Sequence, residues 1–240
     1  MESHRQFLDA DGRLTMEMGG FLVRLADRLV LIDTGIGPHG DPTRTGTFMA
    51  SLAAFGVDPS DITDVVLTHL HFDHLGWASD GERPLFPRAV YRCHAADWEF
   101  FMGDDPHDDS LGVSFLGGRP AAELLPPLAA RMEMWGGDDS VLPGLDVRSA
   151  PGHTPGSTVI VLSSGTDRAL LLGDVVHCPA ELLSDDWEAV FDVDRDLARR
   201  TRQALAEELA GSDIPAAGAH FPGLRFGRLL AGQGRRHWVF

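Results

Sequence analysis

The sequence feature that most constrains this chain is the segment 68–77, which crowds three imidazoles and a carboxylate together. Such side chains suit zinc and neighbouring divalent metals, and a catalytic site needs them while keeping one coordination position for water. The segment follows the apolar run Asp64–Leu67, so we expect a buried strand to end where these side chains begin. In a loop beyond a strand, side chains can point in two directions, so one segment can serve two metals. The candidate ligands are His69, His71, Asp73 and His74.

Three further segments each place one ligand-type side chain beside an apolar, strand-like run. His153 lies just before the run 157–162, and Asp174 closes the run 169–174. His220 lies in a stretch of small apolar residues further along the chain. These segments extend the first cluster and together predict a metal centre built from histidine and aspartate.

The order of these segments resembles that of the metallo-β-lactamase superfamily of hydrolases. The resemblance runs nearly from end to end, because Leu29–Gly35 is similar to the family's early strand and turn, and the ligand segments follow in the family's order. It implies two Zn²⁺ ions, with Mn²⁺, Co²⁺ or Fe²⁺ as alternatives, and Asp174 as the bridge between them. The ligands implied for the first metal are His69, His71 and His153, and those for the second are Asp73, His74 and His220.

The same resemblance implies an α/β fold, the four-layer αββα sandwich, with the ligands on loops along one edge of paired sheets. The chain has 240 residues, 43% of them hydrophobic, and one domain covering residues 1–240 is expected. Helices are predicted over Asp194–Ala210, where leucine and threonine recur at four-residue steps before Gly211, and over Thr45–Phe55. Strands are predicted over Phe21–Leu25, Leu29–Ile32, Val65–Leu67, Ala89–Tyr91, Val159–Leu162 and Ala169–Leu172.

The region 94–141 mixes large apolar side chains with glycine, proline and acidic groups. Such a region can form a cap that supplies a substrate wall or a dimer contact, and ordinary helix packing is the alternative. Within it, Ala95–Met102 is predicted to be a packed helix and Pro106–Gly118 a loop near the substrate. His107 is expected to be solvated, and a structural role is favoured for His39 over a substrate contact.

The charge balance argues against several partners. The formal net charge is −16, and all 20 basic residues are arginines with no clustered basic tract. Binding to a phosphate backbone needs a positive stripe, so nucleic acid is not expected as a partner. No apolar run approaches the roughly 18 residues of a membrane span, and the N-terminal residues do not resemble a signal peptide. We therefore expect a cytoplasmic protein that acts on a small molecule; a homodimer stays open. The two cysteines, Cys93 and Cys178, are expected to be ordinary buried or half-buried thiols.

His177 stands three residues after Asp174, at a position that is typically tyrosine in the acyl-homoserine-lactone lactonases of the superfamily. The only tyrosine here, Tyr91, lies outside the ligand segments. The pattern Gly-Asp-x-x-His is similar to the branch that contains methyl-parathion hydrolases and related lactonases and esterases. His177 is expected to donate a hydrogen bond or proton to the substrate or leaving group, and Asp33 to support the ligand loop. The candidate catalytic residues are Asp73, Asp174 and His177.

The implied reaction is hydrolysis, because two divalent ions can hold a bridging water as hydroxide near neutral pH. The expected substrate is a lactone or carboxylic ester. The alternatives are an organophosphate or thioester, or a specialised biosynthetic role on one carrier-bound intermediate.

Overall fold

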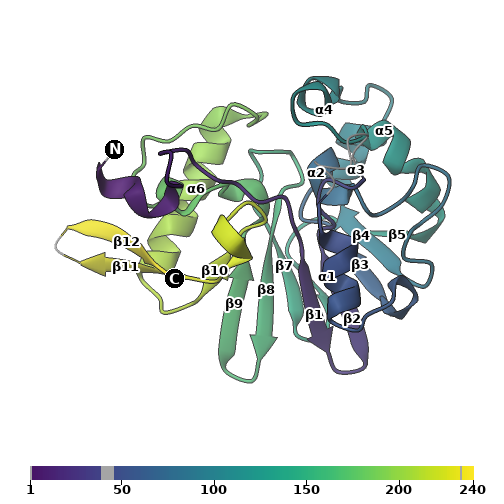
Figure 1. Cartoon of the computed structure of the whole chain (residues 1–240), viewed down its shortest axis with the longest axis horizontal. Helices are drawn as coiled ribbons and strands as arrows, with labels where there is room; N and C mark the ends of the chain where they lie inside the picture. Colours follow the sequence, from purple (N-terminus) through teal and green to yellow (C-terminus); the bar gives the residue numbers. More distant parts are fainter. Residues whose placement is uncertain (1, 39–45, 233) are drawn as a thin grey trace. The chain divides into compact units, whose positions relative to one another are not determined.

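The computed structural model describes residues 2–38, 46–232 and 234–240. The chain divides into two compact units, which we call the first unit (residues 18–139) and the second unit (residues 1–17 and 140–240). Each unit is built on its own sheet of five strands, and Figure 1 labels the elements of both. The predicted α/β class is confirmed.

The sheet of the first unit has the strand order β1-β2-β3-β4-β5, in which only the pair β1 and β2 is antiparallel. The central strand β3 is buried along its whole length, with Val65 paired to Leu31 on one side and to Tyr91 on the other. The carboxyl ends of parallel strands lie at the same edge of a sheet. The ligand segment begins directly after β3, so it lies at that edge. The strands are β1 Phe21–Leu25, β2 Arg28–Ile32, β3 Asp64–Val66, β4 Val90–His94 and β5 Met132–Trp135.

The helices of the first unit are short. Among them, α2 follows β3 almost directly, and α3 begins at the end of β4, where Nδ1 of His94 accepts a hydrogen bond from the Ala96 N–H at 3.0 Å. This contact caps the helix. The helices are α1 Phe48–Ala54, α2 Phe72–Leu75, α3 Ala95–Met102, α4 Ser110–Leu116 and α5 Ala121–Leu124, with 3₁₀ turns at Pro59–Asp61 and Pro126–Arg131.

The sheet of the second unit has the order β10-β9-β8-β7-β6 and is antiparallel between β7, β8 and β9. The hairpin β11–β12 forms a separate small sheet, and the long helix α6 packs beside β11 (Figure 1). The strands are β6 Asp139–Leu142, β7 Leu145–Ser149, β8 Thr158–Ser164, β9 Asp167–Leu171, β10 Ala216–Ala217, β11 Arg228–Gly232 and β12 Arg235–Val239. The 3₁₀ turns are η1 Glu2–Phe7, η4 Gly173–Val175, η5 Pro179–Leu182 and η6 Pro222–Leu224.

Helix α6 runs over Arg195–Ala210, and the carboxylate of Asp194 caps it by accepting the Leu197 N–H at 2.9 Å. The prediction over Asp194–Ala210 is therefore confirmed. Leu205 and Leu209 are buried as the four-residue repeat indicates, but the buried face also contains the charged side chain of Arg202. A buried arginine on an otherwise apolar face needs its own explanation.

The segment Pro106–Gly118 is not a continuous loop, and that prediction is wrong. Residues 110–116 form α4, whose Gly112 lies so close to Phe72 that an added Cβ would be 2.9 Å from Cε1 of that ring. This packing stabilises a helix that the local composition does not favour. Helix α3 matches the prediction for Ala95–Met102.

The helix predicted over Thr45–Phe55 is present as Phe48–Ala54, with Thr47 preceding it. Thr45 and His39 lie outside the described residues. Cys93 and Cys178 are buried free thiols, as predicted. Among the helices of the described residues, none is both long and apolar enough to cross a membrane.

Candidate metal centre

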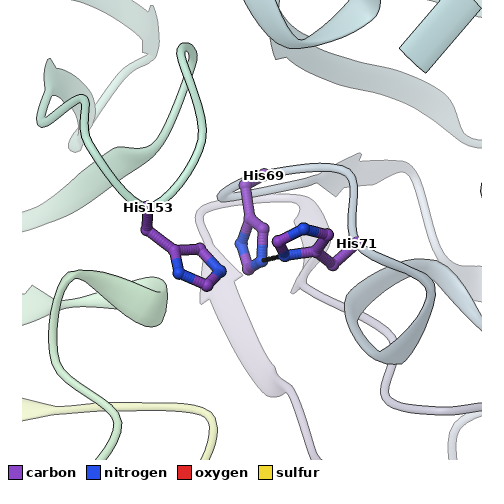
Figure 2. A group of neighbouring side chains, drawn as sticks. All are labelled: His69, His71 and His153. Atoms are coloured by element: carbon purple, nitrogen blue, oxygen red, sulfur yellow. Dashed lines mark hydrogen bonds between the residues drawn. The ribbon is translucent and has the colours of Figure 1, made fainter. Parts of the chain in front are cut away.

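The H-x-H-x-D-H segment leaves β3 and turns directly into α2. His69 and His71 lie in the connecting turn, whereas Asp73 and His74 lie on α2, so only half of the segment is the loop that the sequence predicted. His69, Asp73 and His74 are 1%, 8% and 0% exposed. Nε2 of His69 lies 3.1 Å from Nδ1 of His71, the contact drawn as a dashed line in Figure 2. Two imidazole nitrogens at this separation can share a proton or face a common cation.

Asp33 holds the two ends of this segment. Its carboxylate accepts hydrogen bonds from the backbone N–H and the hydroxyl of Thr68, both at 2.8 Å. The same carboxylate lies 2.9 Å from Nδ1 of His74. Asp33 thus supports the segment, as the sequence predicted, and fixes His74 so that Nε2 is the nitrogen left to bind a ligand.

Two further side chains of the first unit border the segment. Asp97 on α3 is fully buried and accepts the backbone N–H of Leu70 at 3.0 Å. The ring of His71 contacts Phe101 edge to face, with ring centroids 5.5 Å apart. His107 stacks on Phe100 at 4.6 Å between centroids, so it is exposed yet packed rather than simply solvated. The region 94–141 therefore reaches the ligand segment.

In the second unit, Asp174 is surrounded by three histidines. Its Oδ2 atom lies 3.4 Å from Nε2 of His153 and 3.4 Å from Nε2 of His177, and its Oδ1 atom lies 3.2 Å from Nε2 of His220. All four side chains are less than a tenth exposed. His153 lies in the loop between β7 and β8, and His220 lies in the turn after β10. Asp174 lies on η4, and His177 follows it. His153, which Figure 2 also draws, belongs to this unit.

The other ring nitrogen of these histidines is also fixed. Nδ1 of His153 lies 3.0 Å from Oδ1 of Asp192, and Nδ1 of His220 lies 2.6 Å from the Glu17 carbonyl oxygen. Burial lowers the pKa of His153, against the opposing effect of Asp192 and Asp174, and so favours a neutral imidazole. Metal-binding histidines have this arrangement, with Nδ1–H donated to a carboxylate or carbonyl and Nε2 left as the ligand. The donor set fits divalent metal ions.

His177 joins this group although the resemblance does not place it among the ligands. His153, Asp174 and His177 each offer a ligand atom, and these atoms lie within 4.8 Å of one another. The backbone N–H of His177 donates to Oε2 of Glu181 at 3.1 Å, and its Nδ1 lies 3.6 Å from Oε1. Burial opposes the imidazolium, but the carboxylates of Asp174 and Glu181 outweigh it and raise the pKa of His177 well above its usual value.

Sequence reasoning missed three acidic residues around the site. Asp192 contacts His153, Glu181 contacts His177, and Asp97 accepts the backbone N–H of Leu70. Asp192 precedes the α6 cap without any local motif, and it is 39 residues from His153 in sequence. Glu181 has a weak signal, because it lies four residues after His177 on a proline-started turn. Asp97 has no sequence signal, because an acidic residue in the first turn of a helix is common.

Comparison with known proteins agrees with this chemistry. Residues 20–210 match the Metallo-beta-lactamase superfamily. Metallo-beta-lactamase domain-containing protein 1 of Xenopus laevis is 28% identical over 224 residues, which are 92% of this chain and 76% of that protein. A probable metallo-hydrolase of Mycobacterium tuberculosis is 31% identical over 181 residues, or 65% of this chain and 56% of that protein, so the chain spans little more than half of that relative.

Solved structures give the same result. AidC, a dizinc quorum-quenching lactonase in complex with the product N-hexanoyl-L-homoserine, superposes with a TM-score of 0.82 at 26% identity, covering 96% of this chain and 81% of AidC. AbOPH, a hydrolase in the β-lactamase superfamily, superposes with a TM-score of 0.85 at 24% identity over 99% of this chain and 84% of its own, a likeness in fold. The chain belongs to the metallo-β-lactamase superfamily, has its fold, and is a metal-dependent hydrolase.

Proposed function

We propose that the chain is a dinuclear metal hydrolase that opens a lactone or cleaves a carboxylic ester. The observation that carries the proposal is Asp174, whose two carboxylate oxygens each face imidazole Nε2 atoms at 3.2 to 3.4 Å. A carboxylate with ligand-type nitrogens at both oxygens suits a bridge between two cations. In this proposal His69, His71 and His153 would hold one ion, Asp73, His74 and His220 would hold the other, and Asp174 would be a ligand of both.

Two divalent ions held by these residues would supply a hydroxide nucleophile near neutral pH and would polarise the substrate carbonyl. Residues of the chain position the side chains that would hold these ions. Asp33, Asp192 and the Glu17 carbonyl orient the imidazoles of His74, His153 and His220.

His177 serves the leaving group in this proposal. When the bond between the carbonyl carbon and the leaving oxygen breaks, its electron pair goes to that oxygen, which takes a proton from Nε2 of His177. The proton lost by the attacking water restores His177. The carboxylate of Glu181 supports the role, because its Oε1 atom lies 3.6 Å from Nδ1 of His177 and favours the protonated imidazole.

A lactone or carboxylic ester is the first choice of substrate because the AidC similarity, at 26% identity over 96% of the chain, is to a lactonase. A net charge of −16 disfavours polyanionic substrates. An organophosphate triester and a thioester are the rival small-molecule substrates.

The test combines metal analysis with a substrate panel. The purified protein, loaded in turn with zinc, manganese, cobalt or iron, should retain about two ions per chain. It should then hydrolyse an acyl-homoserine lactone or an aryl ester faster than a thioester, an organophosphate triester or a β-lactam. A folded protein with only trace metal would refute the dinuclear assignment, and a preference for the thioester or triester would refute the substrate class.

A further inference from the structure

We propose that Arg202 is a positioning residue that holds both His153 and His177 in place through two separate carboxylates. The inference rests on the proposed function, because it takes His153 as a metal ligand and His177 as the proton donor to the leaving group. Arg202 lies on α6, is 4% exposed, and does not contact either imidazole in any described hydrogen bond.

The first connection runs through Asp192. Nη2 of Arg202 donates to Oδ2 of Asp192 at 3.1 Å, while the other oxygen of that carboxylate lies 3.0 Å from Nδ1 of His153. Both oxygens of Asp192 are therefore engaged, and the carboxylate cannot rotate without losing one partner. Arg202 thus fixes the group that sets the tautomer and orientation of His153.

The second connection runs through Glu181. Nε of Arg202 lies 3.5 Å from Oε2 of Glu181, the oxygen that accepts the His177 backbone N–H. The same Nε donates to the Val175 carbonyl at 3.2 Å, beside Asp174 in the sequence. One guanidinium therefore contacts the carboxylate next to His177 and the backbone next to Asp174.

The planar guanidinium is suited to this task. Its Nε and Nη2 atoms point at fixed angles, so a single group can contact two carboxylates, whereas a lysine ammonium is one point charge on a flexible stem. A buried ion pair is weak evidence for stability, because replacing all of its members together by apolar side chains of similar volume is often neutral. The placement is explained by the two carboxylates, each of which would lose its positive neighbour if Arg202 were removed.

The decisive experiment compares Arg202→Met, which keeps the length of the side chain, with Arg202→Lys. The matched control is Arg199→Met, on the same helix, where the arginine is 43% exposed and pairs with Asp196 at 3.0 Å. Zinc affinity is measured by competition with a chromophoric chelator. Arg202→Met should weaken affinity by about 10- to 100-fold, as is typical when a group behind a metal ligand is lost, and Arg202→Lys by less. Arg199→Met should bind zinc like the parent, because exposed ion pairs contribute little.

Two further variants separate the connections. Asp192→Asn should reproduce the loss of zinc affinity, and adding Arg202→Met to it should cost less than the sum of the single changes. Glu181→Gln should keep zinc affinity but change the dependence of turnover on leaving group. Parental zinc affinity in folded Arg202→Met overturns the proposal. If Arg202→Met does not fold, Arg202→Lys decides: parental affinity together with an unchanged leaving-group dependence overturns it.

A metal-free measurement separates this inference from the proposed function. Nitrogen-15 NMR of the histidine rings should find the proton of His153 on Nδ1 in the parent and a mixture of tautomers in Arg202→Met. If the parent hydrolyses no ester or lactone but this change is seen, the positioning role stands and the proposed function fails. If esters are hydrolysed and neither tautomer nor zinc affinity changes, the positioning role alone fails.

Discussion

Asp33 accepts from the imidazole of His74 at 2.9 Å while occupying a left-handed backbone conformation with φ of 58°. This conformation is unusual for a residue with a side chain, although aspartate tolerates it better than most. The backbone N–H of Thr34 next to it donates to the His74 carbonyl at 2.6 Å. The β2 turn and α2 are thus joined at both the backbone and the side chain of one ligand.

Asp33→Asn should weaken metal binding by roughly 10- to 100-fold with the fold intact. The amide retains the size of the side chain but removes the charge that favours Nδ1–H on His74. Chelator competition measures the affinity, and Asp61→Asn, at an exposed turn cap, is the control. Unchanged affinity would mean that Asp33 serves only the backbone turn.

Asp174→Ala should reduce metal occupancy and hydrolysis together, because it removes the proposed bridge. Elemental analysis and turnover are measured on the same preparation. Asp213→Ala, an exposed acid that pairs with Arg228 at 3.0 Å, should leave both unchanged. Full occupancy in Asp174→Ala would contradict the bridging role.

His177→Ala should keep the fold and about two metals per chain but lower turnover by ~10²-fold, the effect of losing an acid-base group. The loss should be largest for esters with poor alkoxide leaving groups and small for nitrophenyl esters, because nitrophenolate departs without a proton. Equal losses for both esters would remove the leaving-group role. A fall in stability or metal content would instead indicate a structural role.

Gly112→Ala should change the preference among esters of different acyl length while metal content stays the same. The added Cβ would be 2.9 Å from the Phe72 ring, so the ring or α4 has to shift where α4 packs on α2. Gly136→Ala, which has open space around the added atom, is the control. An unchanged substrate profile would favour plain helix packing for α4.

Acid should destabilise the first unit through Asp64. Burial would raise the pKa of this carboxyl, but hydrogen bonds from Thr63, Arg92 and Arg28 outweigh it and lower the pKa. A lowered pKa gives stability that is present above the unfolded value of about 4 and is lost as pH falls through the lower folded value. Asp64→Asn should therefore lower Tm at pH 7 and reduce the fall in Tm below pH ~4. Asp104→Asn, at an exposed position, should keep the parental profile.

The sequence was sufficient for the elements whose residues carry the pattern locally. The apolar run around Val65 predicts β3, and the repeat that includes Leu205 and Leu209, ended by Gly211, predicts α6. Helix α4 was missed because Gly112 disfavours a helix, whereas in the structure this glycine lies against the ring of Phe72. Local propensity cannot report such a tertiary contact.

The groups behind the ligands were missed for a related reason. A ligand motif is recognised by its own spacing, whereas Asp192 reaches His153 only because the turn before α6 folds back on the β7–β8 loop. Arg202 has no sequence signal of its own, since helical periodicity does not distinguish a buried charge with two partners from a solvated one.

The contact between Asp33 and the ligand segment limits how far that segment can be transplanted. A protein engineer who grafts residues 68–77 onto another scaffold would copy the ligands but leave behind the carboxylate that receives the Thr68 hydroxyl and the His74 ring. The graft would have the right ligand spacing, but nothing would fix the tautomer of His74. A graft that keeps this contact therefore has to include two separate segments, the ligand segment and the turn after β2 that contains Asp33.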